Sequence, residues 1–209
     1  MTSFELVFAL VTIITSLALT HLLAGFVGAL RNPQRVQFSA PHALWAWAAL
    51  LLTIGNWASF WSLRSLTSWP AWAVLLSVAT MIVQYLFCAF VTPETTAEGK
   101  INLVDFHHRE HHRYALAAAV LFGVSLILNA TFGEAGFYSE WWRDSAFSIT
   151  GLVVALLAYF ISTSWVQVLS AATIALLATY MRLSRAMSWR PDYAMQRSLG
   201  RRGSHDFDV

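Results

Sequence analysis

Charged residues are scarce in this 209-residue sequence. Asp, Glu, Lys and Arg together make up 11% of it, whereas about 25% is usual in soluble globular domains. Hydrophobic residues reach 57%, above the roughly 45–50% of such domains. These two values exclude an ordinary soluble fold. The formal net charge of +2 is too small to indicate a partner nucleic acid.

Cysteine and lysine each occur once. The single cysteine, Cys88, excludes an intramolecular disulfide bond and a metal site built from cysteines. The single lysine, Lys100, falls in a polar stretch between apolar runs, which argues against a Schiff base inside a membrane. Neither a nucleophile with a neighbouring base nor a glycine-rich phosphate loop is present. The sequence therefore predicts no catalytic residue.

Long apolar runs dominate what is present. A helix needs about 20 mostly apolar residues to cross the hydrocarbon core of a membrane. Four runs reach about that length, and a fifth region, residues 145–181, is long enough for two helices. The sequence thus predicts an all-α, polytopic transmembrane bundle of about six hydrophobic helices. Their expected positions are residues 4–30, 42–63, 71–92, 102–132, 145–162 and 165–182.

The polar segments divide the chain into a membrane domain and a tail. Residues 1–182 are expected to form one transmembrane helical domain, and residues 183–209 a basic, disordered C-terminal tail. Residues 102–113 are expected to run directly into the fourth helix, because their charges are spaced four apart. Residues 132–144 are expected to form a loop, because this segment contains two glycines and several charged residues after a long apolar run.

Basic residues predict how the chain is oriented, because they are enriched in cytoplasmic loops. With an external N-terminus, five of them lie inside and two outside. Six further arginines follow residue 181, and they lie outside if residues 145–181 cross twice but inside if they cross once. The single crossing agrees better with the rule and places the tail in the cytoplasm, so the number of crossings stays open between five and six. The inner set is Arg31, Arg35, Lys100, Arg109 and Arg113, and the outer set is Arg64 and Arg143.

Three polar residues are expected near the middle of the membrane. His21 and Gln84 each lie about nine residues from a helix end, which at about 1.5 Å per residue is roughly 14 Å deep. Asn56 lies eight residues from Arg64 and so is also close to the middle of the membrane. An ionisable residue at that depth commonly marks a ligand site or pathway, so these three are the candidates for a ligand site or polar core. The alternative is a purely structural role, in which these side chains form hydrogen bonds between neighbouring helices, as polar side chains commonly do in lipid.

A histidine cluster precedes the fourth apolar run. His107 and His111 are four residues apart, and so are His108 and His112. On a helix this spacing lets two imidazoles reach one divalent ion. The four histidines are therefore candidate ligands for Zn or Fe.

Neighbouring charges leave further interpretations of this cluster open. Asp105 or Glu110 could supply a third metal ligand. Alternatively, Asp105 pairs with Arg109 and Glu110 with Arg113, and the segment is a hydrated helix entrance at the cytoplasmic interface. A surface that responds to pH is a third interpretation, because imidazoles titrate near neutrality.

Two resemblances bear on function. The segment His108-x-x-His111-His112 resembles one histidine box of the membrane fatty-acid desaturases and hydroxylases, in which several boxes hold two irons, although this sequence has no second box. That resemblance implies a metal-dependent membrane oxidoreductase. Residues 4–26 and 104–114 resemble short multi-pass bacterial membrane proteins to which no activity is assigned. This second resemblance implies a bacterial inner-membrane location and supplies no catalytic residue.

The predicted function is that of a non-enzymatic, multi-pass inner-membrane protein with a small-ligand-binding, transport-associated or accessory role. The alternative is a metal-dependent membrane oxidoreductase that uses the histidines at residues 107–112. Expected partners are the lipid bilayer and either a second copy of the chain, packed through Gly25 and Gly28, or partner membrane helices. No cofactor is predicted apart from a metal ion at the histidine cluster.

Overall fold

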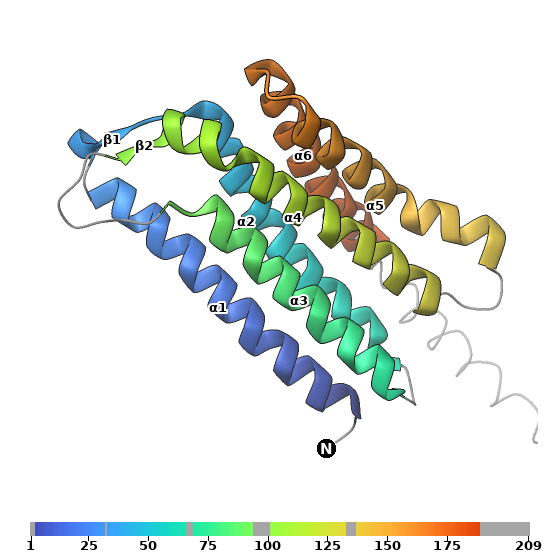
Figure 1. Ribbon diagram of the computed structural model, residues 1–209. Helices are drawn as coiled ribbons and strands as arrows, with labels where there is room; N and C mark the ends of the chain where they lie inside the picture. The colour runs from blue at the N-terminus through green and yellow to red at the C-terminus, as the bar shows by residue number, and fades with distance from the viewer. Residues whose placement is uncertain (1–2, 32, 66–68, 94–100, 133–136, 189–209) are drawn as a thin grey trace, which may run out of the picture.

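The computed structural model describes residues 3–31, 33–65, 69–93, 101–132 and 137–188. Six α-helices run in alternating directions through this part of the chain (Figure 1). The predicted all-α bundle of six helices is therefore confirmed. The helices are α1 Ser3–Arg31, α2 Ala40–Phe60, α3 Ala71–Val91, α4 Leu103–Phe132, α5 Phe137–Phe160 and α6 Ser164–Ser188.

Short elements lie at the ends of the bundle. The two strands pair in parallel, with Val36 opposite Ile101, and so tie the connection after α1 to the start of α4 (Figure 1). The remaining two elements are 3-10 helices. The four elements are η1 Pro33–Arg35, β1 Val36–Gln37, η2 Trp61–Ser65 and β2 Ile101–Asn102.

The six helices form a closed ring of neighbours. α1 packs against α3, α3 against α4, α4 against α5, α5 against α6, and α6 against α2, which returns to α1. α2 also contacts α3 and α4, so it links opposite sides of the ring. The largest fully buried side chains, Trp45, Tyr114, Phe87 and Phe122, come from α2, α3 and α4. These residues belong to one cluster, which is the main core of the bundle.

Proline marks two of the helix ends as the sequence suggests. Pro41 stands in the first turn of α2, where the backbone N–H that proline lacks is not needed. α3 ends at Val91, and Thr92, which precedes Pro93, has an extended backbone with φ −89° and ψ 118°. A residue before proline is biased toward that conformation, so α3 stops there.

Helix boundaries near the membrane surface differ from those expected. The histidine-rich residues do join α4, but the predicted loop over residues 132–144 is wrong, because α5 already begins at Phe137. α6 likewise continues to Ser188 instead of ending at residue 182. Falling hydropathy marks the edge of the hydrocarbon layer, and a helix continues beyond it where neither proline nor glycine intervenes. The rest of the predicted tail, residues 189–209, lies outside the described residues.

The outer surface of the bundle is strongly apolar. α1 to α4 are long and apolar enough to cross a membrane, and α5 and α6 contain shorter apolar stretches, Ser145–Phe160 and Ser164–Tyr180. Large apolar side chains are exposed on several helices, among them Leu30 (63%), Leu75 (70%) and Leu176 (70%). Soluble monomers rarely expose apolar surface so widely. The protein is therefore a multi-pass helical membrane protein whose outer surface suits contact with lipid.

α5 and α6 form an antiparallel hairpin. Its turn, residues 161–163, lies at the same end of the bundle as β1 and β2, and α6 ends at the end where α1 begins (Figure 1). If all six helices cross the membrane completely, the basic residues divide into five on the turn side and eight on the side of the chain ends. The positive-inside rule then favours cytoplasmic chain ends, opposite to the external N-terminus expected above.

Candidate functional site

Two of the three predicted mid-membrane residues are in contact. Asn56 on α2 donates from Nδ2 to Oε1 of Gln84 on α3 at 2.7 Å. Gln84 donates from Nε2 to Thr53 Oγ1 at 3.0 Å, and the same nitrogen lies 3.7 Å from Cys88 Sγ. Thr53 donates its proton to the carbonyl oxygen of Ala49 at 2.7 Å. Gln84 is only 1% exposed, so its amide is satisfied entirely by groups of α2 and α3.

His21, the third predicted residue, does not join this network. Its side chain is exposed on α1, and its ring centroid lies 6.2 Å from that of Tyr85 on α3. Exposed residues that share this side of α1 define its outer face. The structure thus brings Asn56 and Gln84 together and leaves His21 at the surface. The outer face of α1 consists of Ile13, Leu17, Thr20, His21 and Ala24.

The opposite side of α1 packs against α3. Val11 is fully buried there, and Thr15 donates from Oγ1 to Met81 Sδ at 3.5 Å. Gly25 faces Thr92 so closely that a Cβ atom added to the glycine would overlap Thr92 Cγ2. Gly25 therefore packs against a residue of its own chain, and the expected contact between copies through Gly25 and Gly28 stays a prediction.

The histidine cluster consists of two buried and two exposed rings. His107 and His111 are each 3% exposed, and their ring centroids lie 5.8 Å apart. His108 and His112 are exposed. Residues four apart share a helix face, which explains why the rings separate in this way. Only the first pair is turned into the bundle.

Backbone carbonyl groups determine where two of these rings carry their proton. His111 Nδ1 lies 3.0 Å from the carbonyl oxygen of His108, and His112 Nδ1 lies 2.8 Å from that of Tyr159. Because a carbonyl oxygen only accepts, both Nδ1 atoms donate and both Nε2 atoms carry a lone pair in the neutral ring. His111 Nε2 is buried and has no hydrogen-bond partner within the described part of the chain.

His107 has a different kind of partner. Its Nδ1 atom is hydrogen-bonded to the hydroxyl group of Tyr114, one of the fully buried residues of the core. His107 is thereby anchored at the inner side of α4.

The described residues add no third metal ligand to this pair. In the ranges that the structure describes, no three His, Cys, Asp or Glu side chains lie so as to hold one ion. Asp105 accepts a hydrogen bond from Asn102 Nδ2 at 2.7 Å, and Glu110 pairs with Arg113 at 3.0 Å, as one interpretation of the sequence expected. Both carboxylates that could have supplied the third ligand are therefore engaged. Metal binding by the histidines remains a prediction.

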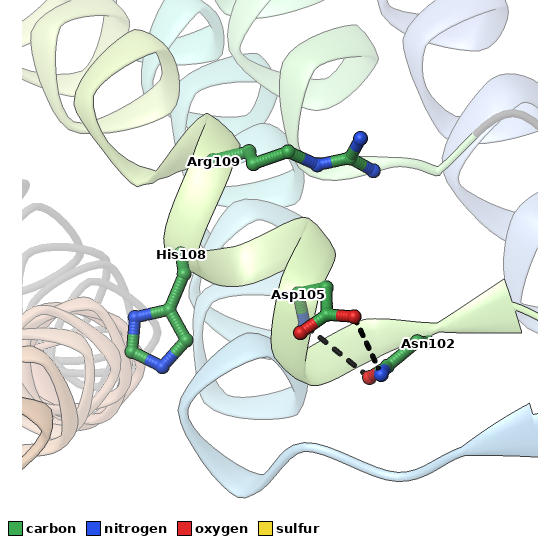
Figure 2. Close-up of a pocket in the computed structure, with 4 residues that line it drawn as sticks. All are labelled: Asn102, Asp105, His108 and Arg109. Atoms are coloured by element: carbon green, nitrogen blue, oxygen red, sulfur yellow. Dashed lines mark hydrogen bonds between the residues drawn. The ribbon is translucent and has the colours of Figure 1, made fainter.

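An open depression of about 510 Å³ lies at the start of α4, lined by Asn102, Asp105, His108 and Arg109 (Figure 2). Asn102 caps the helix, because its Oδ1 atom accepts hydrogen bonds from the N–H groups of Val104 and Asp105 at 3.0 and 3.2 Å. Figure 2 shows Arg109 directed away from Asp105, so the predicted pair between these two residues is not formed. The lining side chains do not converge on one point, and the depression is an open surface.

Sequence reasoning missed a polar centre at the same end of the bundle. Gln167 on α6 is fully buried and donates from Nε2 to the carbonyl oxygens of Ala158 and Ile161 at 2.7 and 2.9 Å. Its Oε1 atom accepts a hydrogen bond from Trp45 Nε1 at 3.2 Å. Gln167 thereby closes the turn between α5 and α6 and links it to α2. A glutamine within an apolar run was the signal available in the sequence.

Compared with protein-family models, with curated proteins and with solved structures, the chain shows no significant match. No family is identified. The resemblance to short bacterial membrane proteins, and the inner-membrane location that it implies, therefore stay predictions.

Proposed function

We propose that this protein is a non-enzymatic accessory membrane subunit that assembles with a second copy of itself through the outer face of α1. The exposed position of His21 carries this proposal, since the ring lies near the middle of a helix that is long and apolar enough to cross a membrane. Polar side chains at such depth almost always face protein or a water-filled cavity, because lipid offers no hydrogen bonds. An outward-facing His21 therefore supports a further helix covering this face.

A second copy offers His21 a matching partner. Copies of one chain insert in the same orientation, so in a two-fold pair each residue of α1 meets its equivalent at the same depth. A neutral imidazole has one N–H donor and one acceptor nitrogen, and two His21 rings can therefore bond to each other or to Thr20. Ala24 lies on the same outer face, and its small side chain allows the two backbones to approach closely.

The remaining mid-membrane residues favour assembly over an internal ligand site. Asn56 and Gln84 are bonded to each other, and Gln84 is also bonded to Thr53. Hydrogen bonds between helices hold membrane bundles together. A ligand that bound there would first have to break these bonds, and for this reason we favour the accessory role over small-ligand binding or transport.

Cysteine crosslinking in native membranes tests the proposal. Cys88, the single native cysteine, is replaced by Ala, and Ala24→Cys is added on the outer face of α1. If two such faces meet, an oxidant or a short bismaleimide should produce a covalent dimer. Leu176→Cys is the matched control, because this residue is 70% exposed on α6, and it should remain monomeric.

A second variant tests the role of the imidazole itself. His21→Leu should lower the yield of the Ala24→Cys dimer without changing the helix content of the protein. Absence of a dimer at Ala24→Cys, or an equal yield at Leu176→Cys, would contradict assembly through α1. Crosslinking of Ala24→Cys to a different protein would contradict the proposal that a second copy of the chain covers this face.

A further inference from the structure

We infer that the buried pair His107 and His111 binds one divalent transition-metal ion of the class that prefers imidazole ligands, represented by Zn²⁺ and Cu²⁺. The inference is independent of assembly through α1, since the two regions share no residue. It rests on the hydrogen bonding of the His107 and His111 ring nitrogens and on the distance between the centroids of these two rings.

The first observation is the unpaired Nε2 atom of His111. This ring is 3% exposed, and its Nε2 atom has no hydrogen-bond partner in the described ranges. Native proteins leave few buried polar atoms unpaired, because each costs about 1–3 kcal/mol. Since Nδ1 already donates to the carbonyl oxygen of His108, Nε2 presents a lone pair. Histidines that bind metals characteristically donate their other N–H to such an acceptor.

The second observation is the position of His107. Its Nδ1 atom is hydrogen-bonded to the hydroxyl group of Tyr114. A hydroxyl oxygen can accept this bond, and with Nδ1 as the donor the neutral ring carries its lone pair on Nε2, the atom that would coordinate the ion. Two imidazole nitrogens that each lie about 2 Å from one ion place their ring centroids roughly 5–6 Å apart. The centroids of His107 and His111 are 5.8 Å apart. The separation of the two rings therefore agrees with that of two imidazoles bound to one ion.

The available donor atoms determine the class of ion. Mg²⁺ and Ca²⁺ require oxygen ligands, and the two nearest acidic side chains on α4, Asp105 and Glu110, are bonded to Asn102 and Arg113. Neutral imidazole nitrogen suits Zn²⁺, Cu²⁺ and Ni²⁺. No third protein ligand stands among the residues described, so water or a small ligand completes the coordination.

Electron paramagnetic resonance with Cu²⁺ is the direct test, because hyperfine splitting counts the nitrogen ligands. The full chain is purified without a histidine tag, treated with a chelator and titrated with Cu²⁺. The wild type should bind one ion with two imidazole nitrogens, and Zn²⁺ should compete for the site. His107→Ala and His111→Ala should each weaken binding at least about tenfold, since loss of a supporting partner alone costs 10- to 100-fold.

His108→Ala is the matched control, because this ring lies on the same helix but is exposed. It should retain the wild-type affinity and spectrum. His111→Gln serves as a second variant that keeps a polar side chain of similar size, and circular dichroism verifies the fold of every variant. A wild-type spectrum without two imidazole nitrogens, unchanged affinity in folded His111→Gln, or an equal loss in His108→Ala would overturn the inference.

Discussion

Two glycines inside helices should respond to alanine in opposite ways. Gly151 on α5 faces the ring of Phe122 on α4, and a Cβ atom added to this glycine would lie 2.5 Å from Cε1 and Cζ of the ring. A Cβ atom added to Gly123 on α4 would meet no neighbouring atom within 4 Å in the described structure. Both substitutions make the same change within a helix, so their difference isolates the packing of α4 on α5.

The packing of Phe122 sets the size of the effect. This ring is 2% exposed and makes an edge contact with Phe147, with centroids 5.7 Å apart, so it cannot move out of the way freely. Overpacking a core costs about 1–3 kcal/mol, whereas Ala is favoured over Gly inside a helix by about 1 kcal/mol. Gly151→Ala should therefore lose about 0–2 kcal/mol of unfolding free energy, and Gly123→Ala should gain up to about 1 kcal/mol.

Reversible unfolding in detergent micelles, followed by circular dichroism while dodecyl sulfate is increased, measures this difference. Adding Phe122→Leu to Gly151→Ala should restore part of the lost stability, because the smaller side chain leaves room for the new methyl group. Equal stability of the two single glycine variants would refute the close contact of α4 and α5 at this point.

Two further predictions concern the polar network and the orientation of the chain. Gln84→Leu should lower the unfolding free energy by about 1 kcal/mol, because it removes two hydrogen bonds between helices that contribute roughly 0.6 kcal/mol each. Ser16→Ala is the control and should change the unfolding free energy less, because the Ser16 hydroxyl group bonds within its own helix. Equal effects of the two substitutions in the same unfolding assay would contradict a stabilising role of the polar network. With six complete crossings and cytoplasmic chain ends, green fluorescent protein should fluoresce at either end and alkaline phosphatase should be inactive at both. An active phosphatase at the C-terminus would show that α6 ends outside.

The number and approximate position of the helices could be predicted from the sequence, because spans of about 20 apolar residues are required by the thickness of a membrane. The rotation of each helix about its own axis could not be predicted from the sequence. In lipid, both the inward and the outward side of a helix are apolar, so no amphipathic pattern identifies the buried side. Ala18 and His21 lie one turn apart on α1, yet Ala18 is fully buried and His21 is exposed.

The candidate sites were predictable to a similar extent. Depth alone placed Asn56 and Gln84 at one level, and the two are hydrogen-bonded. Depth could not show that His21 lies on the exposed side of α1, because it says nothing about the direction of a side chain. Spacing of four residues predicts that the rings of His107 and His111 lie near each other, and their centroids are 5.8 Å apart, but it does not indicate the closer contact between His111 and His112, at 3.8 Å. Nor could spacing show that His107 and His111 are the buried rings, because burial depends on how α4 packs against its neighbours.

The hydrogen bond between Trp45 and Gln167 has a consequence for how the protein is made. The two residues are 122 positions apart, so the ribosome completes α2 long before it reaches α6. Until then the buried indole N–H of Trp45 lacks the acceptor it has in the finished bundle. We expect α2 to remain loosely held in the membrane during this interval, and a chain that stops before Gln167 to be a preferred substrate for membrane quality-control proteases.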